Sequence, residues 1–424
     1  MDRISYLSDD LLLKIFSSLP TKDVVVTMLL SKRWKFLWTM VPKLRFDDEF
    51  ELDPSYYERF LKYVDKSMVL NRAQVLETVK FDVGPCCSSE DIATWIRIGM
   101  ARNVRELEIS HCEGYFREHR SIKLPKSLYS YEKLEVLKLA STVVLNVPIA
   151  VCFPSLKSLH LVCVEYKTKK SHRRLLSGCP VLEELVLGIS YNNSNHVHMR
   201  SFYVEIPTLQ RLSILDASGQ LYDDFTFVVN APSLKYFNFV DFYGDLCLRN
   251  NMPEVVEANV QVIYEDPKKL LGPLKSVKRL SLCLSASTLH NHMEFYQLVH
   301  LELCGDALMW WDILTWMLES SPKLQVLKLY KCECEEHGYS EDPIEDHWEE
   351  PSSVPECLLF HLNIFEWRYY NAGDEEKKVV AYILKNARQL KTAAFSAPYL
   401  YQKEELNELV YMARASSSCQ LLLD

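Results

Sequence analysis

Apolar residues recur along most of this chain in short groups, in which a leucine or valine is followed three and five positions later by further apolar residues. Thirteen such groups start at residues 76, 104, 134, 156, 182, 209, 234, 255, 277, 298, 324, 362 and 390. The steps between starts run from 21 to 38 residues. Within each group the last two apolar residues alternate with the residues between them, which is the two-residue period of a β-strand with one buried face.

Six of the 18 prolines lie two residues before the start of a group: Pro154, Pro180, Pro207, Pro232, Pro253 and Pro322. Because proline cannot donate a hydrogen bond to a sheet, we expect it just before each strand, where it ends the preceding helix or loop. A single match arises easily by chance in a hydrophobic chain. Thirteen matches at a near-constant step predict a leucine-rich-repeat solenoid, whose stacked strands form a parallel sheet over one continuous core.

The register of these strands predicts which side chains face outward. They are mixed in charge and include the tyrosines and arginines that interfaces favour. The simpler alternative is a solvated sheet face that binds nothing. We interpret the face as a surface for a protein target, with these candidate contacts: His160, Arg211, Tyr236, Asn238, Arg279, His300, Glu302, Lys328 and Tyr330.

Residues 7–38, ahead of the repeats, have the spacing of three short amphipathic helices. Ser8 is placed to cap the first helix, and Pro20 to end it. Three helices of this length cannot bury so many apolar groups among themselves. They therefore either seal the first repeat or bind another protein.

The run LSDDLLLKIFSSLPTKDVVVTMLLSKRWKFLW resembles an F-box, a motif that binds Skp-type adaptors. The resemblance implies that Val24, Leu29, Trp34 and Leu37 close the three-helix packing. Where the family has a proline after the first leucine, this chain has Ser8, which can cap the helix but removes an apolar contact. The adaptor-binding residues implied by the resemblance are Leu7, Leu11, Leu12, Ile15, Phe16, Leu19, Pro20 and Val24.

The carboxy-terminal stretch contains the segments VPECLL, FEWRYYNAGDEEKKVVAYILKNARQLKTA and SSSCQLLLD. With these segments it is similar to the FBD domain that follows leucine-rich repeats in a large plant F-box family. We expect a helix from Asp374, another over 403–414 and a closing strand over 419–423. The expected domains are an F-box (1–45), a helical linker (46–75), the solenoid (76–353) and an FBD domain (354–424) that caps it. The fold class is thus α/β, a three-helix F-box followed by a leucine-rich-repeat solenoid with a parallel sheet.

Charge and composition exclude several classes of function. Nine acidic residues and no lysine or arginine lie between Glu333 and Glu350, which accounts for the whole net charge of −9. A neutral body with an acidic loop is a poor binder of nucleic acid. The longest uncharged stretch, 141–156, is too short to span a bilayer, and the amino terminus lacks the apolar core of a signal peptide. Thirteen scattered cysteines indicate a reducing compartment, so we expect the cytoplasm, the nucleus or both.

Nothing in the sequence predicts catalysis, a metal or a cofactor. Cys332, Cys334 and His337 lack a fourth ligand for zinc. The 11 glycines form no phosphate-binding loop, and no hydrolase or metalloprotease motif is present. The stripe of Trp310, Trp311, Trp316 and Met317 could line a ligand pocket, but we expect it to pack the convex side of the solenoid.

These features favour a non-catalytic substrate receptor of an SCF-type ubiquitin ligase, bound through its adaptor to a cullin. Two alternatives remain open from the sequence. One is a leucine-rich-repeat scaffold with a degenerate F-box that acts outside the ligase. The other is a sensor that holds a small molecule between repeat loops and target.

Overall fold

The computed structural model of the chain describes residues 4–48, 53–112, 121–189, 201–216, 225–240, 245–249, 252–263, 270–285, 293–304, 310–330, 347–397 and 406–423. The chain divides into two compact units at strand β11 (Arg211–Asp216). Unit 1 comprises residues 1–209 and 215–220, and unit 2 comprises residues 210–214 and 221–424. Within the described ranges, no helix is both long and apolar enough to cross a membrane.

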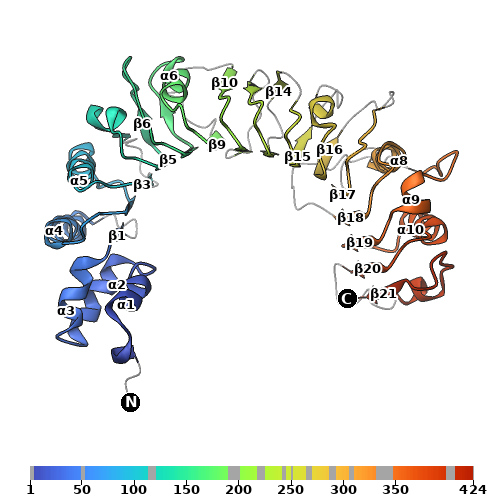
Figure 1. Cartoon of the computed structure of the whole chain (residues 1–424), viewed down its shortest axis with the longest axis horizontal. Coiled ribbons are helices and arrows are strands. Elements are labelled where there is room, and N and C mark those ends of the chain that lie inside the picture. The colour runs from blue at the N-terminus through green and yellow to red at the C-terminus, as the bar shows by residue number, and fades with distance from the viewer. Residues whose placement is uncertain are drawn as a thin grey trace. The chain divides into compact units, whose positions relative to one another are not determined.

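Unit 1 begins with short helices around one small core (Figure 1). Ser8 caps the first α-helix, since its side chain accepts a hydrogen bond from the Leu11 amide, and Pro20 separates that helix from the second. The elements are η1 (Ile4–Tyr6), α1 (Asp9–Phe16), α2 (Thr21–Val26), η2 (Thr27–Leu29), α3 (Trp34–Leu37) and η3 (Trp38–Met40).

A parallel sheet follows in unit 1, with the order β1-β2-β3-β5-β7-β9. Its strands are β1 (Lys43–Asp47), β2 (Thr78–Val83), β3 (Glu106–His111), β5 (Val136–Ser141), β7 (Ser158–Val162) and β9 (Glu184–Ile189). Helices α4 (Pro54–Leu70) and α5 (Ser89–Ala101) lie side by side along one face (Figure 1). The remaining elements are β4 (Ile122–Lys123), η4 (Lys126–Ser130), β6 (Val143–Leu145), β8 (Glu165–Tyr166), α6 (Ser171–Ser177) and β10 (Ser201–Glu205).

Unit 2 continues the same plan, with parallel strands in chain order from β13 to β21. The strands are β13 (Tyr236–Val240), β15 (Glu257–Ile263), β16 (Arg279–Ser285), β17 (His300–Cys304), β18 (Val326–Tyr330), β19 (Ile364–Arg368), β20 (Thr392–Ser396) and β21 (Gln420–Leu423). Separately, β12 (Thr226–Asn230) pairs with β14 (Asp245–Leu248). The helices are η5 (Gly272–Leu274), α8 (Trp310–Ser320), α9 (Glu356–Phe360), α10 (Asp374–Asn386) and η7 (Asn407–Tyr411).

All thirteen apolar groups of the sequence form strands, and each strand begins two residues after the start of its group. The closing strand is also present as β21, and the helix expected from Asp374 is α10. Of the helix expected over 403–414, the described part contains the 3-10 helix η7.

Strand β1 is the main difference from the expected organisation. It pairs with β2 in the same sheet, although it lies inside the segments assigned to the F-box and its linker. A fourteenth group, Val41, Leu44 and Phe46, has the repeat spacing and directly follows the helices. The segment expected as a helical linker, 46–75, holds the end of this strand and the whole of helix α4.

Six prolines occupy a repeated turn, each four residues before the strand that follows it. In Phe153-Pro154-Ser155-Leu156, the Leu156 amide donates to the Phe153 carbonyl, and the same bond recurs at the five other proline-bearing groups. Proline therefore takes the second position of a β-turn, where its fixed φ is favourable. The turn, rather than the proline alone, sets where these six strands begin.

The tryptophan stripe packs inside unit 2. Trp310, Trp311 and Met317 of α8 are buried, and Trp310 meets Trp367 of β19 edge-on at 5.9 Å. Trp316, the fourth member of the stripe, is half-buried and meets Phe295 edge-on at 6.0 Å, so the contacts support packing within unit 2.

Candidate functional site

The N-terminal helices bury one side of α1 in a shared core. Leu12 and Phe16 of α1 pack with Val24 of α2, and the Phe16 ring meets Trp34 of α3 edge-on at 5.6 Å. Leu37 is buried in the same cluster. Three residues expected to contact an adaptor, namely Leu12, Phe16 and Val24, thus form the interior that shapes the helices.

The opposite side of α1 remains apolar and exposed. Leu11 and Ile15 leave 47% and 45% of their surface accessible. Leu7 and Leu19 pack partly against the core, and Pro20 is exposed. These five expected contact residues are accessible to another protein.

The second helix adds an exposed apolar surface that sequence reasoning missed. Leu29, expected inside the three-helix packing, is 77% exposed, and Val26 and Leu30 are also exposed. The reason is local, because α2 ends at Val26 and continues as the 3-10 helix η2, which changes the side-chain period. The apolar run from Val24 to Leu30 was the available signal, since one buried face cannot accommodate it all.

Arg33 joins the beginnings of α1 and α3. Its Nε atom donates to Asp9 Oδ1 at 2.8 Å, and Nη2 donates to the Leu7 carbonyl at 2.7 Å and to Asp9. This clamp orients α1 relative to α3, and with it the exposed side chains of Leu11 and Ile15.

The helices also cover the first edge of the sheet. The Arg45 amide of β1 donates to the buried Thr21 hydroxyl of α2 at 2.7 Å. This bond satisfies a backbone donor that an edge strand would otherwise leave open. The helices are therefore docked on the repeats of unit 1 rather than joined by a free linker.

The outward sheet face of unit 1 is a network of ion pairs. Lys138 donates to Glu108 at 2.6 Å and lies 3.5 Å from Glu106. Burial disfavours the charged form of Glu108, but the bond from Lys138 outweighs it and lowers the pKa of this carboxyl. His160, a candidate target contact, lies 3.6 Å from Glu184, and burial lowers the pKa of its imidazole.

The other eight candidate contacts belong to unit 2, and three of them form one charged row. His300 Nε2 lies 2.9 Å from Glu302, whose Oε1 atom lies 3.3 Å from Lys328 Nζ. Lys328 also reaches Glu366 of β19 at 3.7 Å. The His300 hydrogen bond and the Lys328 charge lower the pKa of Glu302 to about 2.

The remaining candidates are distributed over neighbouring strands. Arg211 stacks over the Tyr236 ring at 4.7 Å, and Asn238 accepts a hydrogen bond from Asn259. Arg279 is the register neighbour of His300. Tyr330 lies 3.5 Å from the Ser281 hydroxyl. All nine candidates face outward, but the structure brings only His300, Glu302 and Lys328 into one ion-paired cluster.

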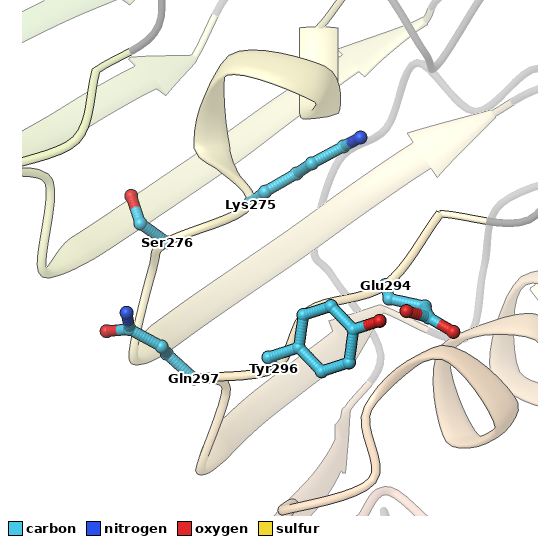
Figure 2. Close-up of a pocket in the computed structure, with 5 residues that line it drawn as sticks. All are labelled: Lys275, Ser276, Glu294, Tyr296 and Gln297. Carbon is cyan, nitrogen blue, oxygen red and sulfur yellow. The ribbon is translucent and has the colours of Figure 1, made fainter.

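A depression of about 540 Å³ lies at the turns before β16 and β17 (Figure 2). The residues that line it include one charge of each sign: Lys275, Ser276, Glu294, Tyr296 and Gln297. None of the candidate target contacts lines it. No group of His, Cys, Asp and Glu in the described part of the chain could hold a metal, and Cys332, Cys334 and His337 lie outside that part.

Comparison with known proteins identifies the modules. Residues 4–46 match the F-box domain, residues 92–258 match the LRR repeats of the FBD-associated F-box protein At5g56370, and residues 349–395 match FBD. A protein of Arabidopsis thaliana named as an FBD-associated F-box protein, At3g50710, is 88% identical over 430 residues and the whole of both chains. The chain belongs to the F-box/FBD/LRR-repeat family.

Other F-box/FBD/LRR-repeat proteins of Arabidopsis thaliana cover the full chain as well. At5g56420 is 43% identical over 433 residues, covering 100% of this chain and 99% of its own. At4g26340 is 43% identical over 432 residues and covers both chains completely. The two resemblances inferred from the sequence are thereby confirmed, and the F-box match ends one residue before the end of strand β1.

Proposed function

We propose that this F-box/FBD/LRR-repeat protein is the substrate-recognition subunit of an SCF-type E3 ubiquitin ligase. The N-terminal helices bind a Skp-type adaptor and, through it, a cullin. The repeats form a solenoid whose outward strand face binds a target protein, and the FBD region caps its last strands. The observation that carries the proposal is that α1 is apolar on both sides, one side buried and the other exposed at Leu11 and Ile15.

The expected adaptor contacts then have two roles. Leu12, Phe16 and Val24 hold the three helices together. Leu7, Leu11, Ile15, Leu19 and Pro20 form the contact surface, and Val26, Leu29 and Leu30 extend it. Burial of each Leu or Ile side chain contributes roughly 1.5–3 kcal/mol before association costs are subtracted.

The receptor contributes proximity rather than chemistry. It holds a target lysine near a ubiquitin-charged conjugating enzyme, which raises the effective concentration of the two reacting groups. No catalytic group on this chain is needed. All eleven cysteines in the described residues are free thiols, which supports a location in the cytoplasm, the nucleus or both.

The test is adaptor binding by the full chain with one anchor replaced. We expect Leu11→Asp or Ile15→Asp to raise the Kd for a purified Skp-type adaptor by about 100-fold or more, because each buries a carboxylate at an apolar contact. Binding is measured by interferometry, and folding by thermal unfolding.

Val256→Asp is the matched control, since Val256 is an apolar residue of unit 2 with similar exposure. It should bind the adaptor like the natural chain. If both α1 variants also bind normally, the proposal is wrong. If the natural chain itself does not bind, the second candidate function gains support. That candidate is a leucine-rich-repeat scaffold whose F-box is degenerate at Ser8.

A further inference from the structure

Exposed apolar side chains are concentrated at the amino-terminal end of unit 1. Twelve of the 22 large exposed hydrophobic residues lie between residues 4 and 70, and the rest of unit 1 contributes only Ile149 and Val181 among its described residues. Two of the twelve, Val69 and Leu70, are 75% and 47% exposed and lie beyond the F-box match. They occupy the last turn of α4.

The amphipathic pattern of α4 does not explain why Val69 and Leu70 are apolar and exposed. The helix packs through Phe60, Val64 and Met68. Its solvent side carries charged residues, among them Lys62, Asp65 and Lys66, until the last turn. Residues four apart share a helix face, so Val69 and Leu70 lie on the same face as Asp65 and Lys66. Polar residues are expected on this solvent-exposed face.

The last turn of α4 is held against the end of the N-terminal helices. Asn71 is buried, and its Nδ2 atom donates to the Val41 carbonyl at 2.8 Å. The Arg72 amide donates to the Thr39 carbonyl in η3. Met40, the neighbour of Thr39, is itself exposed.

Arg102, just after α5, fixes the same turn from the other side. Its Nη1 atom donates to the Asn71 carbonyl at 2.7 Å and also reaches the Met68 carbonyl. Its Nη2 atom donates to Asn71 Oδ1 and to the Ala73 carbonyl, both at 2.8 Å. The fork satisfies carbonyls that the end of α4 leaves open and holds the turn in one position.

We propose that the adaptor-binding surface continues beyond the F-box onto this turn, so that Met40, Val69 and Leu70 form a second apolar contact for the same Skp-type adaptor. The inference rests on the proposed function. Continuity favours the adaptor as occupant, because hydrogen bonds join the turn to residues 39–41 of the F-box. Phe36 and Met40, at the same end of the F-box helices, are also exposed.

The test uses the full chain and a purified plant Skp-type adaptor. We expect Val69→Asp and Leu70→Asp each to raise the Kd by about tenfold or more, since each places a charge in an apolar contact. Thermal unfolding should not change, because both side chains are exposed. Ile149→Asp is the control, as an exposed apolar residue of unit 1 that lies far along the chain.

The outcomes separate this inference from the proposed function. If Leu11→Asp loses binding while Val69→Asp and Leu70→Asp bind normally, the inference is overturned and the proposed function stands. If the natural chain fails to bind, the proposed function fails first.

If Val69→Asp instead dissociates a dimer of this chain and leaves adaptor affinity intact, the turn belongs to a second copy. Should either Asp variant unfold, Val69→Ser repeats the measurement with a smaller perturbation.

Discussion

At the scale of single residues, Leu11 and Leu12 show how little sequence distance separates interior from surface. Leu12 is fully buried, whereas Leu11 is half exposed. The spacing of apolar residues predicted the helix correctly, but five of the eight residues of α1 are apolar. Which of them face inward depends on where α2 and α3 pack, and that information lies elsewhere in the chain.

The two kinds of α1 residue should respond differently to truncation. We expect Phe16→Ala to lower the free energy of unfolding by about 3–5 kcal/mol, because it removes a buried ring that contacts Trp34. Leu11→Ala should change it by about 0.5 kcal/mol or less. Urea denaturation followed by tryptophan fluorescence measures both, and equal losses would contradict this division.

At the scale of elements, helix α6 is docked on strand β10 through aromatic rings. His172 stacks on Phe202 at 4.5 Å, and Arg173 lies over the Tyr203 ring at 3.5 Å. Burial, with a contribution from the Arg173 charge, lowers the pKa of His172 from 6.5 to about 4. The imidazole is therefore neutral in the folded chain at neutral pH.

This docking should make stability depend on pH. Since the folded pKa of His172 is lowered, the unfolded state binds the proton first, and stability falls as the pH drops from about 6.5 towards 4. The loss at pH 4 is on the order of 3 kcal/mol. Comparing His172→Gln with the natural chain isolates it: the variant should lose less stability between pH 7 and pH 4.5. Parallel curves for the two proteins would rule out this role.

Strands of the main sheet could be predicted from sequence, but the smaller strands could not. The thirteen groups of apolar residues each located a strand of the main sheet within two residues, whereas β1 was missed although its own group has the same spacing. By contrast, β4 and β8 contain two residues each, which is too few to show a period. Their pairing with β6 depends on neighbouring repeats, so no local pattern identifies them.

At the scale of the molecule, the boundary between F-box and repeats is the least predictable feature. The expected limit after residue 45 falls within β1, whose first half the helices hold through the bond from the Arg45 amide to the Thr21 hydroxyl. The ion pairs of the charged row His300, Glu302 and Lys328 could not be predicted from the sequence either. Register predicted that each residue faces outward, but which charges meet depends on strand neighbours 26 or more residues apart.

Deleting the helices should therefore damage the repeats. A chain that starts at Lys43 loses the cover over β1, and we expect it to aggregate and to unfold at lower temperature than Leu11→Asp, which keeps the cover. Light scattering after size exclusion, with thermal unfolding, compares the two. A monomeric truncated chain of undiminished stability would show that the helices and the sheet are independent.

The turn before each of the six proline-bearing strands separates the register of the sheet from the length of chain that precedes it. A crossover can gain or lose residues without shifting the following strand, because the turn fixes the residue at which that strand begins. Gene copies of such a protein can thus diversify on the outer loops by insertion and deletion while their sheets remain superimposable. A tag or a sensor peptide placed in a crossover, rather than in a turn, should be accommodated for the same reason.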